Sequence, residues 1–170
     1  AASDVYKRQM PHNAIDPTYT AAMIIARLQA IVGREVDPAD FAVVTVASMH
    51  AGTTNNIIPG EAELVLNCRF YSDRVKAKVY SAIKRVVHAE VLASGSLDQA
   101  MISFFAHGEL LDNDEEVFTR VREQFDGVFG DASVTADPKT VSEDFPVIGQ
   151  AYGAPYFFWL VGCTPHDVWD

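Results

Sequence analysis

The chain has 170 residues, a net charge of −10, and 49% hydrophobic against 21% charged residues. This composition is typical of a globular protein, and an acidic balance without a basic run argues against nucleic acid and anionic membranes as partners. No apolar run approaches the roughly 20 residues of a membrane helix. The two cysteines, Cys68 and Cys163, form no CxxC motif, so we expect reduced thiols and a cytoplasmic location.

The first nine residues, AASDVYKRQ, have no apolar period and lead abruptly into MPHNAIDP. They resemble the translated adapter tract seen at the ends of metagenomic gene fragments, which indicates that residues 1–9 are a non-native tail. On this interpretation the chain is a fragment whose native part began before Met10.

A first helix is expected after Asp16-Pro17, because Asp caps helix starts and proline suits the first turn. It should end at Gly33. Two strands, at residues 41–48 and 62–68, then alternate at period two around residues 53–60, whose double Asn and Pro-Gly predict a turn. The apolar stripe of the helix is Ala21, Ile24, Ile25, Leu28, Ile31 and Val32.

A second helix is expected from a cap at Ser72 or Asp73 to the break at residues 94–96. Residues 99–107 have the apolar, aromatic character of a third strand. The resulting order, helix–strand–strand–helix–strand, matches a βαββαβ split unit that lacks its first strand. The apolar face of the second helix is formed by Val75, Val79, Ile83, Val86, Val87 and Val91.

A different region begins near residue 109. Asp112 or Asn113 should cap a third helix, with a short strand at residues 132–135 and a polar, turn-rich stretch at 136–145. The evenly apolar stretch at 156–161 suits a central strand covered on both faces. The inward face of the third helix is expected to be Val117, Val121, Phe125 and Val128.

Five motifs follow one another along the chain. They are Pro11-His12 with Asp16-Pro17; HAGTTNNIIP at 50–59; Arg69-Phe70-Tyr71; Ser-Glu-Asp-Phe at 142–145; and an aromatic run at 156–162 that ends in Gly. In this order they resemble the M20 metallopeptidase family, within it the amidohydrolase branch that includes hippurate hydrolases and N-acyl-amino-acid amidohydrolases.

The resemblance implies an α/β (α+β) fold in two parts. Residues 10–108 would be a ferredoxin-like βαββαβ lid without its first strand, which commonly mediates a homodimer. Residues 109–170 would be a C-terminal piece of a zinc-peptidase-like α/β catalytic domain. A sheet that lacks a strand exposes an unpaired edge, so we expect this chain to aggregate or to be marginally stable.

The implied reaction is hydrolysis of the amide bond of an N-acyl amino acid. Two divalent metal ions (Zn, Mn, Co or Ni) would activate a bridging water. The family's metal ligands correspond to positions before Met10 and after Asp170. The resemblance therefore assigns no catalytic residue and no metal ligand to this chain, and we expect it to be inactive alone.

For substrate binding, the resemblance matches Asn56 to a lid Asn that contacts the substrate and Arg69 to an Arg that meets its carboxylate. His50 could line the cleft, and Glu143 with Asp144 would support it. Each also has a structural interpretation, as a turn, a strand-end salt bridge or a surface loop. Two further histidines, His12 and His166, are expected to be structural or in a loop rather than metal ligands.

Two other interpretations stay open from the sequence. One is a different M20 peptidase or deacetylase, because the motifs do not define the acyl group, the amino acid or the metal. The other is a non-enzymatic, ferredoxin-like binding or dimerisation module.

Overall fold

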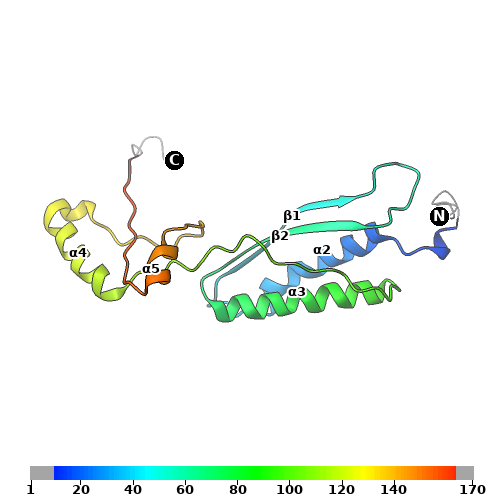
Figure 1. The fold of residues 1–170 in the computed structure, drawn as a ribbon, viewed down its shortest axis with the longest axis horizontal. Coiled ribbons are helices and arrows are strands. Elements are labelled where there is room, and N and C mark those ends of the chain that lie inside the picture. The colour runs from blue at the N-terminus through cyan, green and yellow to red at the C-terminus, as the bar shows by residue number, and fades with distance from the viewer. Residues whose placement is uncertain (1–9, 164–170) are drawn as a thin grey trace. The chain divides into compact units, whose positions relative to one another are not determined.

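The computed structural model describes residues 10–163. The tail at 1–9 and His166 lie outside the described residues. The chain divides into two compact units between Phe104 and Phe105, shortly before the predicted boundary at residue 108 (Figure 1). The first unit contains η1 (Pro11–Asn13), α2 (Pro17–Arg34), β1 (Ala42–Ala51), β2 (Ala62–Phe70) and α3 (Asp73–Ala93); the second contains α4 (Glu115–Phe129), η2 (Gly130–Ala132) and α5 (Pro146–Tyr152).

The two helices of the first unit begin where the sequence predicts. The Asp16 carboxylate accepts hydrogen bonds from the backbone N–H groups of residues 18 and 19, at 2.8 and 3.3 Å. Ser72 Oγ accepts one from the N–H of Val75 at 3.3 Å. These caps satisfy donors that a helix start leaves without intrahelical partners. α2 ends at Arg34, one residue beyond the predicted Gly33, and α3 ends at Ala93, with Ser94 of the predicted break as its C-cap.

β1 and β2 form an antiparallel hairpin, in the register from Ala42 opposite Phe70 to Ala51 opposite Ala62. Ala47 has no partner in β2, and this one-residue bulge reverses the faces of β1 beyond it: Val46 lies opposite core-facing Leu66, whereas Met49 lies opposite core-facing Leu64. The two predicted strands are confirmed, and the first extends three residues further, to Ala51. Within residues 10–163 the sheet contains these two strands alone.

The core of the first unit lies between one face of the hairpin and the two helices (Figure 1). Leu28 and Val79 are 1% and 0% exposed. Three ion pairs lie at the edges of this layer, from Arg27 to Glu90, Arg74 to Asp40 and Arg85 to Glu35, at 2.9, 2.7 and 2.6 Å. Each arginine is well exposed, so these pairs contribute about 0–1 kcal/mol each, and apolar burial dominates the stability of the unit.

The predicted strand at residues 99–107 is wrong: this segment has no strand pairing. In a split βαββαβ sheet, the fourth strand hydrogen-bonds only to the first. Within residues 10–163 no strand precedes α2, so the segment has no ladder to join. One of its aromatic residues, Phe104, instead packs on α3. The Phe104 ring stacks on Tyr80 with a centroid distance of 4.3 Å, and Lys84 Nζ lies 5.1 Å from the centre of the Phe104 ring.

In the second unit, α4 begins after Asp114 rather than after Asp112 or Asn113. The Asp114 carboxylate accepts a hydrogen bond from the N–H of Val117 at 2.9 Å. The predicted inward face is correct for Phe125, whose ring packs edge-on against Trp159. It is wrong for Val128, which is 74% exposed.

Neither predicted strand of the second unit forms. Residues 130–132 make the short helix η2, and residues 156–161 make no strand ladder. A side chain partly replaces the neighbouring strand: Asn113 Oδ1 accepts from the N–H of Phe158 at 2.8 Å, and Asn113 Nδ2 donates to its carbonyl at 3.1 Å. α5 was not predicted. Among the described residues, no helix combines the length and apolarity that crossing a bilayer requires.

Candidate functional site

The loop that joins β1 to β2, residues 52–61, presents the two predicted amides. Asn55 and Asn56 are both exposed on it. The loop narrows where Gly52 approaches Pro59, because a Cβ on Gly52 would lie 3.4 Å from the proline Cβ. Gly52 has a φ of +66°, a conformation that favours glycine. The base of the loop is thus defined while its amides face solvent.

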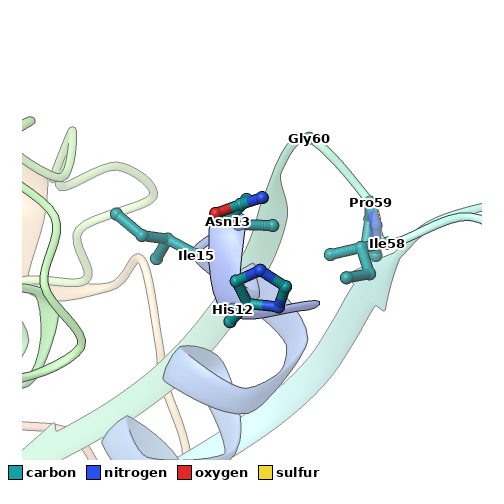
Figure 2. A pocket seen from close by; sticks show the side chains of 7 residues that line it. His12, Asn13, Ile15, Ile58, Pro59 and Gly60 are labelled. Atoms are coloured by element: carbon teal, nitrogen blue, oxygen red, sulfur yellow. The ribbon is translucent and has the colours of Figure 1, made fainter. Parts of the chain in front are cut away.

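A hollow of about 390 Å³ lies between this loop and η1. Figure 2 shows His12 and Ile58 on its opposite sides, the first from η1 and the second from the loop. The hollow combines an imidazole and an amide with aliphatic side chains. Its lining residues are His12, Asn13, Ala14, Ile15, Ile58, Pro59 and Gly60. Two of the motifs from the sequence, Pro-His and Asn-Ile-Ile-Pro, therefore meet here.

Asn56 and Arg69 do not lie together. Arg69 is opposite Val43 and seven residues along β2 from Ala62, the residue that follows the loop. At roughly 3.3 Å per residue, this places it about 23 Å from that end of the hairpin. Arg69 is half-buried, and it has an interaction partner in the chain. The joint grip on one substrate, an inference from both residues sharing a sheet, is not formed by this hairpin; their individual roles stay predictions.

His50 lies at the same end of the hairpin as Asn56. It is the second-last residue of β1, is exposed, and stands opposite Glu63 of β2. Four even-numbered residues of β2 pack on the core, namely Leu64, Leu66, Cys68 and Phe70. Because successive side chains alternate, Glu63 and its partner His50 project from the other face of the hairpin.

Glu143 and Asp144 belong to the second unit, and both are exposed. The Asp144 carbonyl accepts a hydrogen bond from the N–H of Val147 at 3.1 Å, at the start of α5. Their neighbour Ser142 contacts Gly108, where a Cβ would lie 3.6 Å from the serine Cβ. The Asp144 hydrogen bond is made by its backbone, so the support of the cleft by the two carboxylates stays a prediction.

No metal centre is present in the described part of the chain: within residues 10–163, no three His, Cys, Asp or Glu side chains converge. These residues therefore do not fit a metal site, and no catalytic step can be derived through one here.

Within the described part of the chain, three ionisable groups have shifted pKa values, and none of them lines the hollow. Hydrogen bonds from Ser133 and Arg122 lower the pKa of the Asp126 carboxyl. Burial raises the pKa of the Cys68 thiol. Burial also raises the pKa of Tyr80, with a smaller effect from the Cys68 charge.

Sequence reasoning missed the contribution of η1. It treated His12 as structural and gave no role to Asn13 or Ile15. The sequence contained one weak signal of a separate turn before α2. Pro11 suits the start of a short helix, and the N-cap of α2 follows only at Asp16. The position of the loop relative to η1 had no signal in the sequence.

The first unit is a two-layer α/β unit whose hairpin ends in a polar loop beside a small hollow. Comparison with known proteins agrees with this class. The family model for the M20 peptidase dimerisation domain matches residues 8–93, more than half of the chain. The chain therefore belongs to the M20 peptidase family.

The similarity to individual proteins extends into the second unit. An N-acetyldiaminopimelate deacetylase of Streptococcus suis is 31% identical over 160 residues, covering 93% of this chain and 42% of that protein. An N-acetylcysteine deacetylase of Bacillus subtilis is 30% identical, covering 94% of this chain and 41% of the relative. The chain thus spans about two fifths of the length of the curated relatives it matches.

One solved structure has a similar fold and a similar sequence. A Bacillus subtilis protein named as a dinuclear metal-binding peptidase of the M20 family aligns with a TM-score of 0.66 and 26% identity. The alignment covers 83% of this chain and 35% of that one.

Proposed function

We propose that the chain is part of a metal-dependent amidohydrolase that hydrolyses the amide bond of N-acyl amino acids. The observation that carries this proposal is the match to two deacetylases of N-acetylated amino acids over more than nine tenths of the chain. Both relatives are named for the same bond, an acetyl group on an amino acid nitrogen, although their amino acids differ.

In this proposal the described residues bind and orient the substrate, and the metal ligands lie elsewhere in the protein. Two metal ions, when bound, would supply an activated water; the dinuclear metal-binding peptidase supports that number. The exposed amide of Asn56 is suited to donate a hydrogen bond to the scissile carbonyl. His50, at the same end of the hairpin, would line the approach to it.

Arg69 is suited to bind a carboxylate, because a guanidinium makes paired, charge-assisted hydrogen bonds. Its distance from the Asn56 loop means that this contact would belong to a separate surface of the first unit. Glu143 and Asp144 would support the cleft rather than take part in the reaction.

The hydrolysis of peptide bonds is the second candidate, since the solved relative is named a peptidase. Both candidates can be tested on the protein at the full length of its relatives, with N-acetyl amino acids, N-benzoyl amino acids and dipeptides as substrates. We expect cleavage of the acyl amino acids, loss of activity with a chelator, and recovery with Zn or Mn.

If the protein cleaves dipeptides but no acyl amino acid, its function is that of a peptidase. If it cleaves none of these substrates, the non-enzymatic module is the remaining interpretation. Replacing Asn56 by Ala should lower kcat about 10²-fold if its amide meets the developing charge, whereas Asn55→Ala is the matched control on the same loop. The 170-residue chain itself should show no activity with added metal, and activity there would contradict the proposed location of the ligands.

We also propose that the first unit mediates a homodimer. Two features support this: the family model describes a dimerisation domain, and the two-stranded sheet of the described residues leaves one edge of each strand unpaired. Light scattering of the protein at the full length of its relatives should give the mass of a dimer. A monomer at all concentrations would overturn this proposal.

A further inference from the structure

The hollow between η1 and the β1–β2 loop has the features of a ligand pocket. Its volume of about 390 Å³ is within the range of about 300–1,000 Å³ of small-molecule sites. Ile15, Ile58 and Pro59 supply apolar surface, and His12 and Asn13 supply hydrogen-bonding groups at its side (Figure 2). The aliphatic side chains thus form one part of a lining that also exposes much polar surface.

Both walls of the hollow have defined positions. On one side, the N–H of Asn13 donates to the carbonyl of Met10 at 3.0 Å, and the N–H of Ala14 donates to that of Pro11 at 3.2 Å. α2 begins directly after this turn, with its cap at Asp16. On the other side, the contact between Gly52 and Pro59 closes the base of the loop. A ligand would therefore meet a preformed hollow.

The lining indicates which end of a substrate fits. Among residues 10–163, no Arg, Lys or carboxylate lines it, so these residues supply no cation for the carboxylate of an amino acid. Its aliphatic side chains suit a neutral, apolar group. Ile58 is two residues from Asn56, the proposed contact of the scissile carbonyl, and the acyl group is attached directly to that carbonyl.

We propose that this hollow is the acyl-group pocket of the enzyme, where Ile58 and Pro59 contact an apolar acyl chain and His12 donates a hydrogen bond at its rim. This inference rests on the proposed function, because it takes N-acyl amino acids as the substrates. It makes His12 and Ile58 determinants of acyl-group specificity rather than catalytic residues. Acyl groups larger than acetyl should bind better, since they cover more of the aliphatic wall.

The test is a two-dimensional NMR titration of the 170-residue chain with N-benzoylglycine and with N-acetylglycine. We expect shifts at residues 12–15 and 58–60, and about tenfold tighter binding of the benzoyl compound. Ile58→Ala should remove most of this preference, whereas Ile25→Ala, a half-exposed isoleucine of α2, should keep it. His12→Ala, which removes the donor at an exposed position, should weaken both ligands about fivefold.

Three results would overturn the inference: no shifts, shifts confined to other surfaces such as that around Arg69, or equal binding of both compounds by the unaltered chain. Hydrolysis by the protein at the full length of its relatives is a separate measurement. If that protein hydrolyses nothing but the shifts appear at the hollow, the proposed function fails and the pocket stands. If it hydrolyses acyl amino acids without these shifts, the pocket alone fails.

Discussion

Gly52 is the position where a single methyl group should disturb the β1–β2 loop most. Its φ of +66° lies in the left-handed region, which costs a residue with a Cβ roughly 1–2 kcal/mol. The new Cβ would lie 3.4 Å from the Cβ of Pro59, an ordinary contact that adds little strain. We therefore expect Gly52→Ala to lower the free energy of unfolding by about 1–2 kcal/mol.

Gly60, eight residues further on in the same loop, is the matched control. It does not have a positive φ, and a Cβ there would meet nothing within 4 Å. Replacing a glycine at such a position restricts the unfolded chain and commonly stabilises by about 0.4–1 kcal/mol. The two substitutions add the same methyl group but should change stability in opposite directions.

Urea denaturation followed by far-ultraviolet circular dichroism measures both changes. With a slope of about 1–3 kcal/mol/M for small proteins, Gly52→Ala should lower the midpoint by roughly 0.3–2 M at an unchanged slope, and Gly60→Ala should not lower it. Equal midpoints for the two variants would refute the assignment of strain to Gly52. They would also remove the basis for a fixed loop base beside the hollow.

Three further predictions concern other parts of the chain. Asn113→Ala removes both hydrogen bonds to the backbone of residue 158 and should destabilise the second unit by about 2 kcal/mol, measured by the same denaturation. Gly149→Ala should cost about 1–3 kcal/mol, because its Cβ would overlap the Tyr156 ring and lie 3.1 Å from a backbone oxygen. A thiol reagent should label the exposed Cys163 rapidly and the half-buried Cys68 slowly. Since burial raises the pKa of Cys68, its contribution to stability is complete below the pKa of the unfolded thiol and is lost as the pH rises through the folded-state pKa.

Each of these predictions has a control in the same chain. Asn55→Ala removes an exposed loop amide and should leave stability within about 0.5 kcal/mol. Gly127→Ala places a methyl group on α4 where nothing lies within 4 Å, so it should not destabilise. Cys163→Ser should abolish the fast labelling alone. Equal labelling rates for the two thiols in the folded protein would contradict the position of Cys68 against the core.

The features that the sequence predicted correctly are local or periodic. The caps at Asp16 and Ser72 depend on side chains within three residues of the groups they bind. The alternation of β1 and β2 needs only one buried face, and both helices of the first unit bury the stripes expected from their spacing. Such signals are complete within a short window of residues, so tertiary structure did not change them.

The two mispredicted strands at residues 99–107 and 156–161 are at places where an element depends on a distant neighbour. Residues 99–107 have strand composition, yet in a split βαββαβ sheet this strand pairs only with the first strand, and no strand precedes α2 within residues 10–163. Residues 156–161 are held instead by the side chain of Asn113. Asp112 or Asn113 was predicted to cap the third helix, and no local pattern indicates that the Asn113 amide binds a backbone far along the chain.

The candidate site shows why distance in sequence is a poor guide to distance in space. Asn56 and Arg69 are close in sequence and were expected to act on one molecule, but an extended strand carries the chain away at about 3.3 Å per residue. His12 and Ile58 are much further apart in sequence, and α2 followed by β1 brings the chain back so that both line one hollow. The loop end of the hairpin therefore gathers Asn56, His50 and the hollow, while Arg69 stands near the stacked rings of Phe41 and Tyr71 at the other end. Substitutions at the loop end should for that reason act on substrate binding together, and those at Arg69 should act independently of them.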